Sequence, residues 1–197
     1  DPFRPSPDRA RVIHPWFAGA PTPRVLAHRG LVTPRMVSDG VVENSFAALA
    51  QAHAAGVTYV ESDCHITRDG VVVLFHDDDL RRVTGDPRAI ASVTAREIED
   101  LMGTRGGLVT LRGALQAFPT LRFNLDVKAA GAAPFVGREV ADSGARVVLV
   151  DADSHPLVAE LAAELVDLEH LLLVDGPEPR GLAPFTSPDA PGIEELR

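Results

Sequence analysis

The chain has 197 residues, 45% of them hydrophobic, and a formal net charge of -9 at pH 7. This length and composition predict one globular domain with a substantial core. The acidic balance argues against a nucleic-acid partner, which would need a basic patch. The single cysteine, Cys64, excludes an internal disulfide framework, and no apolar run is long enough for an integral membrane segment. A cytoplasmic location is the default expectation, and a chain that begins at Asp1 is also compatible with a leader that has been removed.

Proline-rich sequence brackets the predicted core on both sides. Residues 1–23 are expected to form an irregular N-terminal arm, and residues 177–197 a loop-like tail. Residues 24–176 between them are predicted to form one domain. Short apolar runs in this domain predict buried strands at residues 25–27, 59–60, 71–75, 121–127, 147–150 and 171–174.

Helices are predicted between most of these strands. The segment from Ser45 to Ala55 follows Asn44 as its expected N-cap, and the segment from Thr94 to Met102 opens on a capping-box pattern. The segment from Leu157 to Val166 is rich in alanine, leucine and glutamate. Repeated alternation of strands and helices predicts a parallel sheet.

The predicted fold is an α/β protein with a TIM-like (β/α) barrel. Residues 71–75 are apolar at every position, as in strands that are buried on both faces. About six strands can be recognised, whereas a closed TIM barrel has eight. The predicted barrel is therefore incomplete at the C-terminus. A truncated chain, a partial gene product and a partner chain that closes the sheet are all compatible with this pattern.

Polar side chains gather at or near the ends of four predicted strands, where an α/β barrel carries its catalytic groups. Side chains of a strand alternate between its two faces, so Glu61 and Asp63 project the same way. Asp126 likewise shares a face with Asn124 and Lys128. Carboxylates on one interior face need a cation to stay charged at low cost. Glu61, Asp63 and Asp126 therefore predict an oxygen-rich site for Mg²⁺ or Ca²⁺.

Basic side chains beside these carboxylates suit an anionic substrate. The guanidinium group of Arg29 can hold two phosphate oxygens, and the ammonium group of Lys128 adds a point charge. His28 and His76 can share general acid and general base work, because imidazole titrates close to neutral pH. This combination indicates cleavage of a small-molecule phosphodiester.

Three further residues near these groups have alternative interpretations. Cys64 faces away from Asp63 and is expected to pack in the core. His65 shares the face of Asp63, where it lines the rim or, as the favoured alternative, is exposed to solvent. Glu43 is a metal ligand, a partner that orients a histidine, or an acid favoured by the first turn of a helix.

Six short motifs follow one another between Val25 and Lys128. They are Val25–Gly30, Glu43–Ser45, Glu61–Asp63, Thr67–Gly70, Val73–Asp77 and Asp126–Lys128. Their types and order resemble those of glycerophosphodiester phosphodiesterases. The resemblance implies a TIM barrel that hydrolyses glycerophosphodiesters to sn-glycerol 3-phosphate and an alcohol.

The resemblance also implies roles for individual residues. His28 and His76 would form the acid/base pair. Arg29 and Lys128 would contact the phosphate, and Asn44 would contribute to substrate binding.

A divalent cation is a further implication of the resemblance. Its ligands would be Glu61, Asp63 and Asp126, with Glu43 as an additional candidate. Mg²⁺ or Ca²⁺ is expected, and Mn²⁺ is a third option. Asp126 stands where the family usually has glutamate, which is one methylene longer, so the metal distance or metal preference is expected to differ.

Two rival functions stay open at this point. One is a phospholipase D-like lyase of the sphingomyelinase D type, on the same barrel. The other is a non-catalytic barrel fragment that binds phosphate esters. The motifs Glu43–Ser45 and Asp126–Lys128 favour the phosphodiesterase over the lyase.

Overall fold

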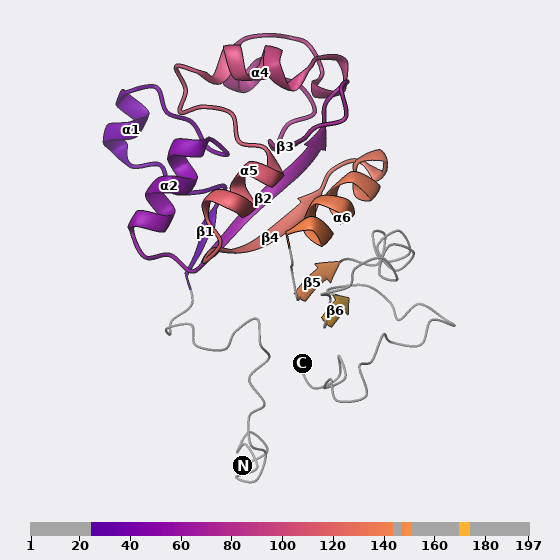
Figure 1. Ribbon diagram of the computed structural model, residues 1–197. Helices are drawn as coiled ribbons and strands as arrows, with labels where there is room; N and C mark the ends of the chain where they lie inside the picture. Colours follow the sequence, from indigo (N-terminus) through magenta and orange to yellow (C-terminus); the bar gives the residue numbers. More distant parts are fainter. Residues whose placement is uncertain (1–24, 144–146, 151–169, 174–197) are drawn as a thin grey trace, which may run out of the picture.

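The computed structural model describes residues 25–143, 147–150 and 170–173, whose strands form two sheets (Figure 1). In the larger sheet, two strands flank a long central strand as parallel neighbours, and a third pairs antiparallel with its C-terminal part. The smaller sheet is a parallel pair. All six strands lie at or beside the apolar runs that predicted them. Their bounds are β1 (Leu26–His28), β2 (Tyr59–Ile66), β3 (Val72–Leu74), β4 (Arg122–Val127), β5 (Val147–Val150) and β6 (His170–Leu173).

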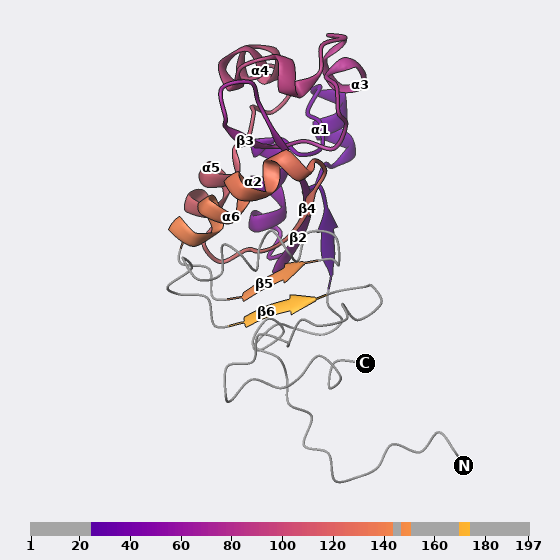
Figure 2. The ribbon, with the colours of Figure 1, turned by 90° about the vertical axis from the view of Figure 1, so that its right-hand side faces the viewer.

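Six α-helices and two short 3-10 helices are described. Figures 1 and 2 show α2, α5 and α6 together on one side of the larger sheet. The predicted helix at residues 157–166 lies outside the described residues, and α1, α3, α5 and α6 have no counterpart among the predicted helices. The bounds are α1 (Pro34–Ser38), α2 (Phe46–Ala54), α3 (Arg81–Thr84), η2 (Ile90–Ser92), α4 (Ala95–Met102), α5 (Leu111–Ala117), η3 (Ala130–Ala132) and α6 (Ala133–Asp142).

Two predicted helices are confirmed, with a correction at one N-terminus. Helix α4 begins with the expected capping box, in which Thr94 and Glu97 exchange side chain to backbone hydrogen bonds. Helix α2 is capped by Ser45, whose hydroxyl oxygen accepts from the backbone N–H of Ala48 at 3.1 Å. Asn44, the predicted N-cap, instead precedes the cap in a left-handed conformation with φ of 50°.

Strand β3 has the predicted burial but not the predicted direction. Val72, Val73 and Leu74 are each 2% exposed or less. The strand nevertheless runs antiparallel to β2, because the five residues between the two strands are too few for a parallel crossover, which takes a dozen or more. A turn closed by hydrogen bonds between Thr67 and Val71 makes the connection instead. β3 therefore extends β2 as a hairpin and is not one of the parallel strands.

The two faces of β2 have different environments. Val60 and Cys64 pack in a core with Leu49 of α2 and Ala114 of α5, which confirms the predicted packing role of Cys64. Burial raises the pKa of the Cys64 thiol, so it stays protonated. Alternate residues of β2 project to the opposite face. In a (β/α) barrel the helices cover the outside of the sheet, so this opposite face is the barrel interior.

A second core supports the segment that follows β3. The backbone N–H of Phe75 donates to the carbonyl oxygen of Asp63 at 2.9 Å. The chain therefore leaves β3 beside the middle of β2, and His76 comes next. The buried residues of this second core are Val73, Phe75, Leu80, Ile90, Val93, Ile98 and Met102.

The larger sheet is open within the described ranges. In these ranges, β1 and β4 each have β2 as their one pairing partner, so the outer edge of each strand is unpaired there. Exposed residues along both strands, such as Leu26 and Asn124, agree with a barrel whose wall is incomplete. Among the helices of these ranges, none has the length and apolar character that crossing a bilayer requires.

Candidate active site

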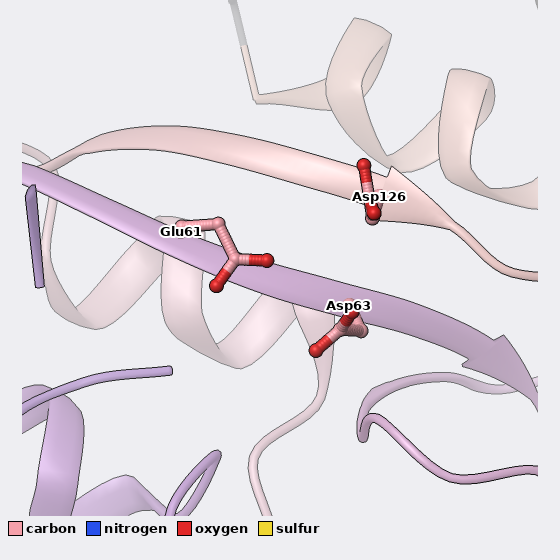
Figure 3. A group of neighbouring side chains, drawn as sticks. All are labelled: Glu61, Asp63 and Asp126. Carbon is pink, nitrogen blue, oxygen red and sulfur yellow. The ribbon is translucent and has the colours of Figure 1, made fainter. Parts of the chain in front are cut away.

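Three carboxylates from two neighbouring strands meet on the sheet face opposite the helices. Glu61 and Asp63 belong to β2, and Asp126 belongs to β4 (Figure 3). Asp63 and Asp126 are paired residues in the parallel register. One carboxylate oxygen of each of the three residues lies within 4.8 Å of the others. The structure thus brings together the three side chains that the alternation of the strands predicted.

The negative charge of this cluster is only partly balanced. Burial, followed by the charge of Asp63, raises the pKa of the Glu61 carboxyl group, although His28 and Arg29 oppose the shift. The Oε2 atom of Glu61 is buried and has no hydrogen-bond partner among the described residues. A buried oxygen without a donor, beside two further carboxylates, is an environment that a hard divalent cation stabilises. The donor set therefore fits a divalent metal site.

Two basic side chains reach Asp63, which is 1% exposed. The Nζ atom of Lys128 lies 2.9 Å from Oδ1 of Asp63 and 3.0 Å from Oδ2 of Asp126. The Nε atom of Arg29 lies 3.3 Å from Oδ2 of Asp63. The hydrogen bond from Lys128 to Asp63 raises the pKa of Lys128, which keeps its ammonium group charged. Arg29 and Lys128, the two residues predicted to contact a phosphate, thus lie at the edge of the carboxylate cluster.

The backbone around Arg29 follows an unusual path that ties three motifs together. Arg29 and Gly30 have φ values of 56° and 89°, the left-handed region that favours glycine. The N–H of Arg29 donates to the carbonyl oxygen of Glu61, and its own carbonyl oxygen accepts from the N–H of Asn44, both at 2.9 Å. A Cβ atom on Gly30 would lie 2.9 Å from Cβ of Ala48. Glycine is therefore required where this turn approaches α2.

Asn44 holds Asp63 from inside the protein. Its Nδ2 atom donates to Oδ2 of Asp63 at 3.3 Å, and its Oδ1 atom accepts from the hydroxyl group of Ser62 at 2.7 Å. Only 2% of Asn44 is exposed. These contacts use both ends of the amide, which favours a positioning role over the predicted substrate contact.

The two predicted acid/base histidines occupy different settings. His28 ends β1 with a 67% exposed side chain, and its Nε2 atom lies 3.6 Å from Oε2 of Glu61. His76 follows β3, and its Nδ1 atom lies 2.7 Å from Oδ1 of Asp77. An ionised carboxylate only accepts hydrogen bonds, so Nδ1 of His76 carries a proton and Nε2 is left to exchange one.

Arg82 was not among the predicted site residues. Its Nε atom donates to Oδ2 of Asp77 at 2.6 Å, and its Nη2 atom donates to Oε1 of Glu43 at 2.7 Å. The hydrogen bond from Arg82, helped by that from His76, lowers the pKa of Asp77 to about 2. Arg82 and Glu43 are 39 residues apart in the chain, and only the placement of α3 brings them together. No spacing rule in the sequence signals this contact.

Glu43 is not one of the three clustered carboxylates that the described residues contain. Its Oε1 atom accepts from Nη1 of Arg29 at 3.0 Å as well as from Arg82. Burial by itself raises the pKa of Glu43, but the hydrogen bonds and charges of the two arginines outweigh it and lower the pKa. An ionised carboxylate between two arginines favours an orienting role over the predicted ligand role, but the groups that it contacts are arginines and not the histidine of the prediction.

His65 corrects the expectation of a solvent-exposed side chain, because it is only 5% exposed. β2 extends to Ile66, beyond the predicted run, and pairs there with β3. The Nε2 atom of His65 lies 3.2 Å from the carbonyl oxygen of His76. His65 therefore supports the backbone that carries His76.

Comparisons with known proteins cover the part of the chain that carries these residues. The model of the glycerophosphoryl diester phosphodiesterase family matches residues 28–139. The chain is 35% identical over 118 residues to the Mycobacterium tuberculosis protein called "Probable glycerophosphodiester phosphodiesterase 2", a match that covers 58% of this chain and 45% of that protein. It is 31% identical over 101 residues to lysophospholipase D GDPD1 of Homo sapiens, covering 44% of this chain and 32% of that protein. The chain thus matches less than half the length of these relatives.

Solved structures support the fold. A phosphodiesterase of Oleispira antarctica, solved in complex with the product sn-glycerol-3-phosphate, has a TM-score of 0.57 and 22% identity, covering 81% of this chain and 68% of that chain. The glycerophosphoryl diester phosphodiesterase domain of a Mycobacterium tuberculosis protein also has a TM-score of 0.57, at 21% identity. This match covers 75% of this chain and 59% of that chain. These likenesses confirm the predicted TIM-like barrel with an incomplete wall. Since the family match spans more than half of the 197 residues and includes the clustered carboxylates and both histidines, the chain belongs to the glycerophosphoryl diester phosphodiesterase family.

Proposed function

We propose that this protein hydrolyses glycerophosphodiesters to sn-glycerol 3-phosphate and an alcohol, and that the reaction needs a divalent cation. The cation is Mg²⁺ or Ca²⁺, with Mn²⁺ as a third option. The observation that carries the proposal is the convergence of Glu61, Asp63 and Asp126, three carboxylates from two strands. Arg29 and Lys128 lie at the edge of the same cluster. An anionic phosphodiester needs this combination of a cation site and nearby basic groups.

The cation would be held by Glu61, Asp63 and Asp126. When bound, it would reduce the negative charge on the phosphoryl oxygens in the transition state. The Oε2 atom of Glu61, which is buried and has no hydrogen-bond partner among the described residues, supports this assignment. Asn44 fixes Asp63 through its amide N–H, so that the carboxylate is oriented before a ligand arrives.

The basic and imidazole groups of the chain would carry out the remaining steps. Arg29 and Lys128 bind and orient the phosphate oxygens. One of the two histidines removes a proton from the attacking hydroxyl group, and the other gives a proton to the leaving alcohol oxygen. Asp77 accepts from Nδ1 of His76, which leaves Nε2 of this ring to take up or release that proton.

The attacking group is either water or the neighbouring glycerol hydroxyl group. The second route makes a cyclic phosphate, the product expected of a lyase of the sphingomyelinase D type. The similarity to human lysophospholipase D GDPD1 makes lysophospholipids a second substrate class to test. The two routes differ in product and can be separated directly.

The experiment uses the full 197-residue chain with glycerophosphocholine, and in parallel with lysophosphatidylcholine, and follows the products by ³¹P NMR. We expect sn-glycerol 3-phosphate from the first substrate, loss of turnover in chelator, and recovery with Mg²⁺, Ca²⁺ or Mn²⁺. A cyclic phosphate as final product would favour the lyase. Binding of glycerol 3-phosphate without turnover of either substrate would favour a non-catalytic phosphate-ester-binding protein. Full activity in chelator would remove the cation from the proposal.

A further inference from the structure

Arg82 lies between two groups of site residues that are otherwise separate. On one side it holds Asp77, the partner of His76, and on the other it holds Glu43, the partner of Arg29. We propose that Arg82 is a positioning residue that fixes the orientation of the His76 ring and of the Arg29 guanidinium group together. The inference rests on the proposed function, since it assigns a purpose to the contacts of the same site.

The link to His76 is short and directional. Arg82 approaches Asp77 with two nitrogens, Nε at 2.6 Å from Oδ2 and Nη2 at 3.1 Å from Oδ1. A guanidinium group that donates from two nitrogens to both oxygens of a carboxylate fixes the plane of the carboxylate as well as its position. The gripped carboxylate then accepts from Nδ1 of His76 at 2.7 Å. The direction in which Nε2 of His76 points is therefore set by Arg82 through Asp77.

The link to Arg29 starts from Nη2 of the same guanidinium group, an atom that donates to both Asp77 and Glu43. Nη2 of Arg82 reaches Oε1 of Glu43 at 2.7 Å, and this same oxygen accepts from Nη1 of Arg29 at 3.0 Å. Without Arg82, Arg29 would be the one cationic partner of Glu43 among the residues that the structure describes, and Glu43 would have more rotational freedom. Arg29 would then hold its place beside Asp63 less firmly, and the proposed phosphate contact would be less well oriented.

Stability is a weak explanation for these contacts. The side chain of Arg82 is 52% exposed, and ion pairs at exposed positions contribute about 0–1 kcal/mol in most proteins. Arg88 provides a matched comparison, because it also pairs with two carboxylates, Asp86 and Glu97, at 44% exposure. Neither partner of Arg88 touches a proposed site residue in the described part of the chain.

The experiment compares Arg82→Ala with Arg88→Ala in the full chain with metal supplied. We expect Arg82→Ala to lower kcat by about 10–100-fold, the range found when a partner that orients a metal ligand is removed, and to raise KM. Arg88→Ala should leave both constants within about twofold of the wild type. Arg82→Lys should recover only part of the loss, because an ammonium group cannot grip two carboxylates with the same geometry.

Double variants separate the two links. If Arg82 acts through Asp77, then Arg82→Ala combined with Asp77→Asn should lower kcat little more than Asp77→Asn does alone. If it also acts through Glu43, then Arg82→Ala combined with Glu43→Gln should raise KM little more than Glu43→Gln alone. Fully additive losses in both combinations would overturn the proposal.

A readout without turnover tests Arg82 even if the proposed function fails. Long-range ¹H–¹⁵N NMR spectra of the histidine rings, with His76 assigned from a His76→Gln variant, should show changed Nδ1 and Nε2 signals in Arg82→Ala and unchanged signals in Arg88→Ala. Absent turnover with this NMR change would reject the substrate and keep the positioning role. His76 signals and kinetic constants that match those of Arg88→Ala would reject the positioning role.

Discussion

Asp63 and Asp126 face each other across the parallel pair of β2 and β4, yet the first side chain is 1% exposed and the second 60%. The buried carboxylate is fixed by Asn44, Arg29 and Lys128. Among the contacts of the described residues, Asp126 has Lys128 as its ion-pair partner. In the proposed metal site we therefore expect Asp63 to supply an oxygen in a fixed position. We expect Asp126 to supply a second carboxylate from the exposed side of the cluster.

Asp126→Asn should therefore weaken metal binding strongly, because an amide keeps the shape of the carboxylate but loses the anionic charge that a hard cation attracts. Asp126→Glu should bind metal far better than the Asn variant, with a changed preference between Mg²⁺ and the larger Ca²⁺. Calorimetric titration of the three forms with each ion measures this. Equal affinity in the wild type and Asp126→Asn would place Asp126 outside the ligand set.

Glu61 should limit the stability of the protein without metal. Burial and the charge of Asp63 raise its pKa, which means that its ionised form is less favourable in the folded chain than in the unfolded chain. This cost is absent below the unfolded pKa and appears as the pH rises through the folded pKa. At neutral pH in chelator, Glu61→Gln should therefore increase the free energy of unfolding, by about 0.5–2 kcal/mol, a typical gain when a functional strain is removed.

The same Glu61→Gln variant should lose metal affinity. Urea denaturation in chelator and with excess Mg²⁺ checks both effects, because a bound ligand stabilises only the form that binds it. The wild type should gain stability with the ion, and the variant should gain little. A variant that is less stable in chelator and equally responsive to the ion would contradict both expectations.

His28→Ala and His76→Ala should each lower kcat by about a hundredfold or more, the usual scale of general acid–base catalysis. KM should change less, because neither ring is proposed to hold the phosphate. The exposed His53 provides a control, since its Nε2 atom bonds with Thr120 and its ring lies beside Phe118, and neither is a proposed site residue. Steady-state kinetics with glycerophosphocholine distinguish these variants. If His28→Ala and His76→Ala both kept the wild-type kcat, the two histidines would have a structural role and not an acid/base role.

The alternation of strand residues was enough to predict which carboxylates converge. Val60 and Cys64 are apolar and face the helices, so Glu61 and Asp63 must face the other way. The same reasoning placed Asp126 correctly on β4. The direction of strand β3 could not be assigned from its apolar residues, because burial on both faces looks alike in a parallel strand and in an antiparallel hairpin. Its direction follows from the short connection to β2, which the predicted end of β2 at Val60 had concealed.

Contacts that depend on where a helix packs could not be predicted from the sequence. Asn44 resembles an N-cap because asparagine favours that position, but Ser45 supplies the cap and the Asn44 amide bonds with Asp63 and Ser62 instead. Arg82 resembles any arginine of a short exposed helix until α3 is packed beside Glu43. Long-range ion pairs have no periodicity, so the positioning contacts of the site emerged only from the fold.

Asp77 should stabilise the fold in a pH-dependent way. Its pKa is lowered from 3.8 to about 2, chiefly by the hydrogen bond from Arg82. A lowered folded pKa contributes stability that is complete above the unfolded value of 3.8 and is lost as the pH falls through about 2. Asp77→Asn should thus reduce the free energy of unfolding by about 1 kcal/mol at pH 6, given the partial exposure of the pair.

The difference between wild type and Asp77→Asn should narrow when urea denaturation is repeated near pH 3. Asp100→Asn is the matched control, since Asp100 is an exposed acid paired with Arg96 on α4, far from Arg82 in the chain. Its effect should be small at both pH values. A deficit for Asp77→Asn that is constant between the two pH values would argue against an ionised carboxylate as its cause.

Glu43→Gln tests whether the acid of the second motif orients Arg29 or binds metal. Oε1 of Glu43 already accepts from both Arg29 and Arg82, and removal of its charge would loosen both. We expect KM to rise by about 10-fold, on the scale measured for partners that orient a binding group, while the calorimetric affinity for Mg²⁺ and Ca²⁺ stays within about twofold of the wild type. Asp126→Asn, measured beside it, should show the opposite pattern, with metal affinity lost first. If Glu43→Gln instead loses metal affinity to the same extent as Asp126→Asn, Glu43 is a ligand, and its contacts with the two arginines must open when the cation binds.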